Sequence, residues 1–275
     1  MRAKAVCAIL AVCSAGLPVA PALATPQPVK AAVLRSQGTY FLGMTIWREL
    51  NSGWSQFGET PVQIDYTSLA GYDWTASDIA ATGADVLILS APGYLGYSDA
   101  EIDAIIEYVH AGHGIIYTYG LFRGNQSRLA PLVGIGSSIK LGTGTSSFPV
   151  EISALVPEYP LFHGMSMPYT SGVPYVAHTS PLGPWPLDGG TVVANLFNGV
   201  GSPMPSVILR DSGIWRGLYF AYYVEDKSAG ANAQDMQVFY NGLLWTANVP
   251  EPATGLVVLA GAGLLLRRQR RRWFV

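Results

Sequence analysis

The sequence DVLILS (residues 85–90) is the clearest structural signal in the chain, and SDAE (98–101) and GIIYTY (114–119) follow it. Apolar runs without polar alternation are typical of strands that are buried on both faces. A serine followed by acidic residues marks the start of a helix, which we expect to end at Gly112. A strand, a helix and a strand in this order predict a parallel sheet.

The rest of the chain extends this pattern in its first half and loses it in the second. Upstream we expect strands at 29–36 and 62–67 and helices at 39–57 and 74–81. Residues 134–190 are rich in Gly, Ser, Thr and Pro, which indicates short strands and long loops. Further strands are expected at 192–196, 206–209 and 217–223, and a closing helix at 235–247. The sequence therefore predicts an α/β fold with an open, mostly parallel, flavodoxin-like sheet, helices on both faces and an irregular, β-rich second half.

Several segments resemble the class I glutamine amidotransferase-like fold. The segments that carry the resemblance are ADVLILS (84–90), YSDAEI (97–102), YVHAGHGIIYT (108–118), EYPLFHG (158–164) and GLYFAYYVE (217–225). The resemblance covers roughly residues 30–248 and implies a single amidotransferase-like domain over residues 25–249.

The chain departs from this family at the catalytic turn. Glutamine amidotransferases place a cysteine there, activated by a histidine and oriented by a glutamate. This chain has TYGL (118–121) at that turn, and it has no Gly-x-Ser-x-Gly motif. We therefore assign no catalytic residue and expect no amidase chemistry, although another reaction in the same crevice stays open.

The first 24 residues have the three parts of a secretory signal peptide. The basic start MRAK (1–4) precedes an apolar segment (5–17), and ALA (22–24) offers a signal-peptidase cleavage site before Thr25. Both cysteines, Cys7 and Cys13, lie inside this segment. The mature chain would then have no disulfide, no thiolate nucleophile and no cysteine-ligated metal.

The last 26 residues resemble a PEP-CTERM sorting signal. Pro250, Glu251 and Pro252 precede an apolar segment (253–266), which we expect to be helical, and a cluster of arginines. The resemblance implies recognition by exosortase, a membrane cysteine protease, at residues 250–275. Fourteen helical residues span about 21 Å, which is short for a hydrocarbon core of about 30 Å. A plain membrane anchor that is never cleaved is the alternative.

Charge separates the expected mature domain from its tails. Residues 25–249 contain nine Lys and Arg against 17 Asp and Glu, a net charge near −8. Nucleic-acid binding needs clustered basic residues and is not expected here. The expected partners are signal peptidase, exosortase, the membrane and carbohydrate, and the expected location is the cell envelope or surface after export across the inner membrane.

Ligands of open parallel sheets bind beyond the carboxyl ends of the strands. We therefore expect a ligand site lined by Gln37, Tyr94, Tyr119, Arg123 and Glu225, suited to an anionic or hydroxyl-rich ligand. No metal site and no cofactor are predicted.

Other candidate residues are fewer. His110 and His113 share a helix end and could hold a metal, but they also suit the negative end of a helix dipole. His163 and His178 have no partner that the sequence identifies.

Two functions fit these observations. One is a non-catalytic binding or structural protein anchored at the cell surface, in the envelope or an exopolysaccharide matrix. The other is an exported hydrolase that acts on glycans through a carboxylate and a histidine, for which Glu225 and Asp226 are the candidate acids. The two differ in whether Glu225, Asp226 and a histidine meet in one pocket.

Overall fold

The computed structural model describes most of the central part of the chain. The described residues are 27–34, 46–69, 71, 73–89, 96–119, 124–139, 141–145, 150–173, 175–179, 185–197, 199, 202–228 and 230–248. The expected signal peptide, the Pro250–Glu251–Pro252 motif and the apolar segment 253–266 lie outside them. Within the described ranges, no helix is both long enough and apolar enough to cross a membrane.

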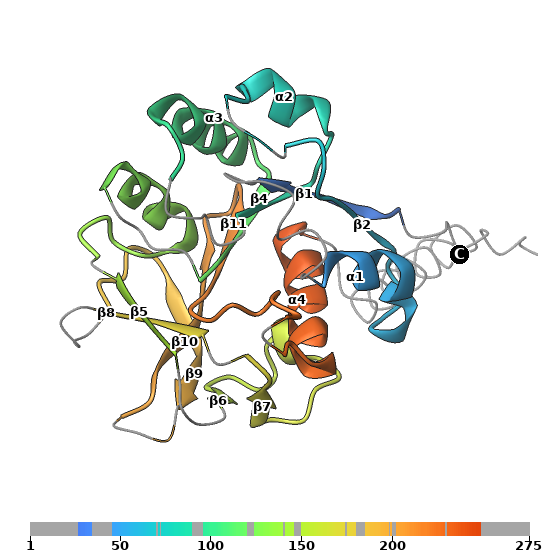
Figure 1. Ribbon diagram of the computed structural model, residues 1–275, viewed down its shortest axis with the longest axis vertical. Coiled ribbons are helices and arrows are strands. Elements are labelled where there is room, and N and C mark those ends of the chain that lie inside the picture. Colours follow the sequence, from blue (N-terminus) through green and yellow to red (C-terminus); the bar gives the residue numbers. More distant parts are fainter. Residues whose placement is uncertain are drawn as a thin grey trace, which may run out of the picture.

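Five parallel strands form one half of a nine-stranded sheet (Figure 1). In sheet order they are β2 (Val62–Asp65), β1 (Val29–Leu34), β3 (Val86–Leu89), β4 (Gly114–Thr118) and β11 (Arg216–Phe220). All four pairings between them are parallel. β3 and β4 are buried at every position, as the apolar runs predict for strands covered on both faces.

Helices cover both sides of these parallel strands (Figure 1). The helical elements are α1 (Trp47–Gly53), η2 (Trp54–Gln56), α2 (Ala76–Ala81), α3 (Asp99–His110), η3 (Gly124–Val133), η4 (Pro160–Phe162) and α4 (Ala233–Thr246). α1 and α4 lie on one side, and α2 and α3 lie on the other. Capping boxes start α2, α3 and α4, in which Thr75, Ser98 and Asn232 each accept a hydrogen bond from the backbone three residues later.

The other half of the sheet is antiparallel. β10 (Met204–Asp211), β9 (Thr191–Phe197), β6 (Val150–Ala154) and β7 (Tyr169–Ser171) extend it in that order from β11. β5 (Leu141–Thr145) and β8 (Tyr175–Thr179) pair in a separate two-stranded sheet. The mixed α/β fold with a β-rich second half is confirmed, but the expectation of a mostly parallel sheet holds only for five strands. A short connection explains the change at β10 and β11, because four residues between two strands can join only antiparallel neighbours.

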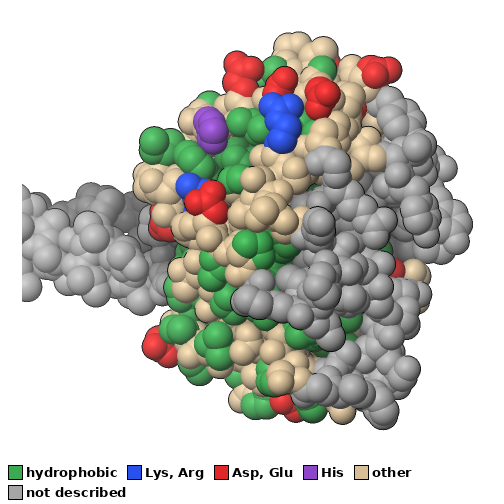
Figure 2. All heavy atoms as spheres, turned by 90° about the vertical axis from the view of Figure 1, so that its left-hand side faces the viewer, with side chains coloured by type: hydrophobic (Ala, Val, Ile, Leu, Met, Phe, Trp, Pro, Cys, Tyr) green, Lys and Arg blue, Asp and Glu red, His purple; other side chains and the backbone are tan. Residues whose placement is uncertain are grey.

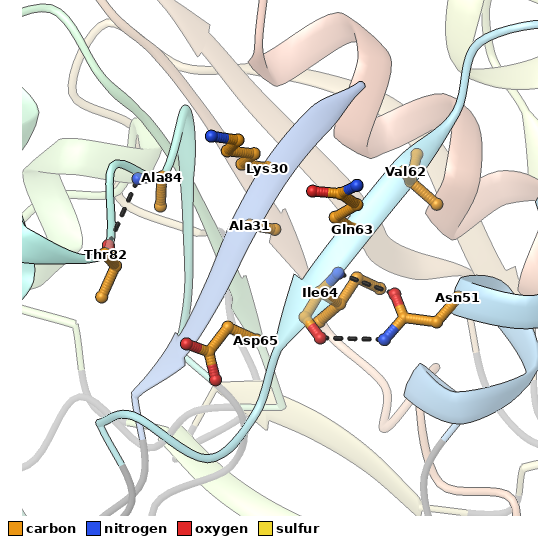
Figure 3. A pocket seen from close by; sticks show the side chains of 9 residues that line it. All are labelled: Lys30, Ala31, Asn51, Val62, Gln63, Ile64, Asp65, Thr82 and Ala84. Carbon is orange, nitrogen blue, oxygen red and sulfur yellow. Dashed lines mark hydrogen bonds between the residues drawn. The ribbon is translucent and has the colours of Figure 1, made fainter. Parts of the chain in front are cut away.

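The free edge of β2 is closed by a side chain. The Asn51 side-chain amide donates to the Ile64 carbonyl at 2.9 Å, and the Ile64 N–H donates to Asn51 Oδ1 at 2.7 Å (Figure 3). Asn51 thus takes the place of a neighbouring strand at this residue. An edge with satisfied backbone groups is a poor template for pairing with another chain.

Candidate functional site

Two of the five expected ligand-site residues, Tyr119 and Glu225, lie in the described part of the chain. Gln37, Tyr94 and Arg123 lie outside it. Tyr119 directly follows β4, and Glu225 lies five residues after the end of β11. Because β4 and β11 are parallel neighbours, both residues follow the same edge of the sheet, the edge formed by the carboxyl ends of the strands.

Glu225 is fully buried at this edge and connects three elements. Thr118, the last residue of β4, donates its hydroxyl hydrogen to Glu225 Oε1. The backbone N–H of Ile46, at the start of α1, donates to the carbonyl of Glu225 at 3.2 Å. The segment after β11 is therefore held against the end of β4 and the beginning of α1.

Tyr119 has a strained backbone. Its φ is +45°, in the left-handed region that residues with a Cβ seldom adopt. Its N–H donates to the carbonyl of Phe220 at 2.8 Å, and its ring stacks on that of Tyr223 with centroids 5.5 Å apart and planes inclined by 13°. Strained residues of this kind concentrate at functional sites, so Tyr119 marks the turn after β4 as a candidate site.

Two buried tyrosines, one on β4 and one on β11, lie beneath this turn. Tyr117 and Tyr219 face each other across β4 and β11, with ring centroids 6.1 Å apart. The Tyr117 hydroxyl donates to Gln126 of η3 at 3.3 Å. Burial raises the pKa of both phenols, so they stay protonated and available as hydrogen-bond donors.

A second buried polar cluster lies around Asp235. Its carboxylate accepts hydrogen bonds from the backbone of Asn232 (3.0 Å) and Gly172 (3.2 Å) and from the hydroxyl of Tyr169 (3.3 Å). The hydroxyls of Tyr169 and Tyr222 are 2.6 Å apart. Sequence reasoning missed this cluster because its members are far apart in the chain. Its one local signal is the capping box of α4, so its evident role is to hold β7 against α4.

Two histidines lie at the opposite edge of the sheet from Glu225. His110 ends α3, with its ring 4.6 Å from that of Trp215, and His113 precedes β4 and stacks on Tyr108 at 3.9 Å. The structure therefore does not bring either of them to Glu225 or Asp226.

The other two histidines, His163 and His178, have no described side-chain contact with Glu225 or Asp226. The carbonyl of His163 accepts a hydrogen bond from Asn241 of α4, and His178 is on β8, where only its backbone is described. Among the described residues, no group of three metal-ligating side chains comes together.

Two pockets lie away from the candidate site. One, of about 380 Å³, lies beside β2 and is lined by Lys30, Asn51 and Asp65 among others (Figure 3). The other, of about 460 Å³, lies at the amino ends of β4 and β11 and includes His113, Arg216 and Asn248. On the face shown in Figure 2, hydrophobic side chains are spread over the described surface, and acidic side chains are more frequent than basic ones.

No protein-family model matches this chain, and no curated protein matches it. Its fold is similar to that of several solved structures. A ThuA-like protein from Bacteroides uniformis aligns with 86% of this chain and 97% of its own, at 12% identity and a TM-score of 0.52. A cytoplasmic protein from Salmonella typhimurium LT2 aligns with 79% of this chain and 99% of its own, also at 12% identity and a TM-score of 0.52. At such identities the similarity shows the fold alone.

Proposed function

We propose that this chain is an exported protein, anchored at the cell envelope, whose amidotransferase-like domain binds a hydroxyl-rich ligand such as a carbohydrate. The observation that carries the binding role is the turn at Tyr119. An aromatic side chain occupies a strained position at the carboxyl edge of a parallel sheet, stacked on Tyr223. An aromatic ring at such a position offers a flat surface for a sugar ring.

The order of the parallel strands supports this location. The strand order β2-β1-β3-β4, with helices on both faces, agrees with the first four strands of the flavodoxin-like order and supports the proposal. In such sheets the ligand lies outside the carboxyl ends, where the strand order reverses between β1 and β3. Tyr119 and Glu225 follow the strands that continue this edge.

The groups near Tyr119 favour binding over nucleophilic catalysis. The Thr118 hydroxyl is fully buried and donates to Glu225, so it faces the interior of the domain. Glu225 is itself buried and is better suited to fix the segment that carries Tyr223 than to contact a ligand. The hydrolase alternative gains no support from His110 or His113, which lie at the far edge.

Export and anchoring rest on the two ends of the sequence. The basic start, the apolar segment and ALA (22–24) favour cleavage before Thr25 by signal peptidase. The Pro-Glu-Pro motif, the apolar segment 253–266 and the arginines favour recognition by exosortase at the membrane. N-terminal sequencing of protein recovered from the envelope tests the first point, and a mature chain that still begins at Met1 would contradict it.

A glycan array tests the binding role. Residues 25–249 contain all the described elements and would be screened as wild type, as Tyr119→Ala and as Tyr159→Ala. Tyr159 is a matched control because it packs against Trp245 rather than at the Tyr119 turn. We expect Tyr119→Ala alone to lose binding to the glycans that the wild type retains. Equal binding by all three, with unchanged melting temperatures, would place the ligand site elsewhere.

A further inference from the structure

The domain ends at the edge of the sheet opposite Tyr119. The carbonyl of Thr246, the last residue of α4, lies against Gly114 at the start of β4, so closely that a Cβ on Gly114 would be 2.5 Å from it. Arg216, which begins β11, donates a hydrogen bond to the carbonyl of Trp245 at 3.0 Å. The chain therefore leaves the domain, at Asn248, at the edge formed by the amino ends of the parallel strands.

The link from this edge to the apolar segment is short. Four residues, 249–252, separate Asn248 from the segment that starts at Ala253. At about 3.5 Å per residue, five steps from Asn248 to Ala253 reach at most about 18 Å. If the tail is held in a membrane, the amino-end edge of the domain must stay close to the bilayer surface.

Exposed apolar side chains gather toward this same edge. The large hydrophobic side chains that are exposed among the described residues are Leu155, Leu187, Phe197 and Ile214. Ile214, the most exposed of them at 66%, is in the turn between β10 and β11 and lines the pocket that contains Asn248. Leu187 lies four residues before β9 begins, and the Leu155 N–H donates to Val193, near the beginning of β9. Phe197 ends β9 and lies at the opposite edge.

Described charges at this edge largely compensate one another. Arg216 pairs with Asp211 at 3.0 Å, and Arg210 approaches Asp188 at 4.0 Å. The edge therefore lacks the basic cluster that would draw it to anionic lipid from solution. The few exposed apolar side chains at this edge are too weak to bind the domain to a bilayer from solution. A membrane tether would keep them at a high effective concentration beside the bilayer surface, where a weak contact is enough.

We propose that the amino-end edge of the sheet, centred on Ile214, rests on the bilayer surface in the anchored protein. This inference rests on the proposed anchoring. Ile214 offers an exposed apolar side chain there, of the kind that enters the interface between headgroups and acyl chains. The Tyr119 turn, at the other edge, then faces away from the membrane.

Fluorescence quenching by lipid tests the contact. The test uses the expected mature form, residues 25–275, which has no native thiol because Cys7 and Cys13 lie in the signal peptide, so Ile214→Cys can be labelled uniquely with bimane. Phe197→Cys is the matched control, an exposed apolar residue at the opposite edge. The labelled chains are reconstituted in vesicles of equimolar phosphatidylethanolamine and phosphatidylglycerol that contain a lipid with a nitroxide near the headgroup. We expect the label at position 214 to be quenched at least about twofold more than the label at position 197.

The other possible results contradict either the contact at Ile214 or the proposed membrane anchoring. If the chain floats with the vesicles but both labels are quenched alike, the domain does not rest on this edge, although the anchoring stands. A label at position 214 that is shielded from iodide but not quenched by lipid would show that a protein, not the bilayer, covers Ile214. If the chain does not float with the vesicles, the proposed anchoring fails and the contact fails with it. Melting temperatures close to that of the wild type would show that both variants fold.

Discussion

Thr118 donates a hydrogen bond to the carboxylate of Glu225, 107 residues further along the chain. The bond joins the end of β4 to the segment that follows β11, and both side chains are fully buried. It fixes the position of the loop that presents Tyr223 to Tyr119. The candidate site thus depends on a polar contact that lies beneath it.

Removal of the Thr118 hydroxyl should destabilise the domain. Thr118→Val keeps the shape of the side chain but removes a donor to a buried carboxylate, so we expect the free energy of unfolding to fall by about 2 kcal/mol. Thr118→Ser retains the donor and should lose less than half as much. Urea denaturation measures both. Equal losses in the two variants would assign the effect to packing rather than to the hydrogen bond.

The strained backbone of Tyr119 predicts an unusual order of substitutions. Glycine adopts a φ of +45° freely, whereas alanine does not. We expect Tyr119→Gly to be more stable than Tyr119→Ala by about 1 kcal/mol, although glycine lacks any side chain. Thermal or urea unfolding of the two variants measures the difference. A less stable glycine variant would show that the turn is not held in the left-handed region in solution.

Asn51 should protect the edge of the sheet. Asn51→Ala leaves the N–H and carbonyl of Ile64 without their side-chain partner, and we expect a loss of about 2 kcal/mol in the free energy of unfolding. We also expect more self-association, because an open edge strand can pair with another copy. Light scattering and urea unfolding report the two effects. Gln63→Ala, an exposed change on the same strand, serves as the control and should alter neither.

Asp235 and Asp78 should respond to pH in opposite directions. Burial raises the pKa of Asp235, while hydrogen bonds from the Thr75 backbone and side chain lower that of Asp78, from an ordinary value of 3.8 in each case. The contribution of Asp235 to stability is therefore full below pH 3.8 and falls as the pH rises through its raised pKa. The contribution of Asp78 is present above pH 3.8 and is lost as the pH falls through its lowered pKa.

Both carboxylates occupy the same position in a capping box, so Asp235→Asn and Asp78→Asn form a matched pair. As the pH rises from below 3.8, the stability of Asp235→Asn relative to wild type should increase. Over the same titration, the stability of Asp78→Asn relative to wild type should decrease. Urea unfolding at a series of pH values measures both. Parallel trends in the two variants would mean that Asp235 is less desolvated in solution than its position in the fold implies.

The sorting proposal predicts the effect of one substitution in the tail. Glu251→Ala should leave the longer, unprocessed chain in the membrane, because the exosortase would no longer recognise the motif. Mass spectrometry of the C-terminus compares the variant with the wild type, in cells with and without the exosortase. The same C-terminus in every case would favour a plain membrane anchor.

The parts of the fold that the sequence predicts well are those with local signals. β3 and β4 are continuous apolar runs, and α3 begins with a capping box, so their type and approximate bounds follow from the sequence. The antiparallel extension was less predictable. β6 and β7 are short strands. β6 pairs with β7 and with β9, and no short turn between these strands marks the pairing in the sequence. β5 pairs with β8 in a separate sheet.

The candidate site was predictable only in part. Tyr119 and Glu225 were expected at the carboxyl edge because each follows a recognisable strand. The backbone strain at Tyr119 could not be predicted, because a tyrosine gives no sequence signal for a left-handed conformation. Glycine is the residue that would be expected at such a position. The Thr118–Glu225 bond joins residues too far apart in the chain for any pattern to connect them.

β11 gives the domain one further property. It is hydrogen-bonded to β4 in a parallel pairing on one side and to β10 in an antiparallel pairing on the other. The two halves of the sheet are thus joined along a whole strand and have no hinge between them. A ligand at Tyr119 would therefore contact a platform whose two supporting strands, β4 and β11, keep a fixed spacing.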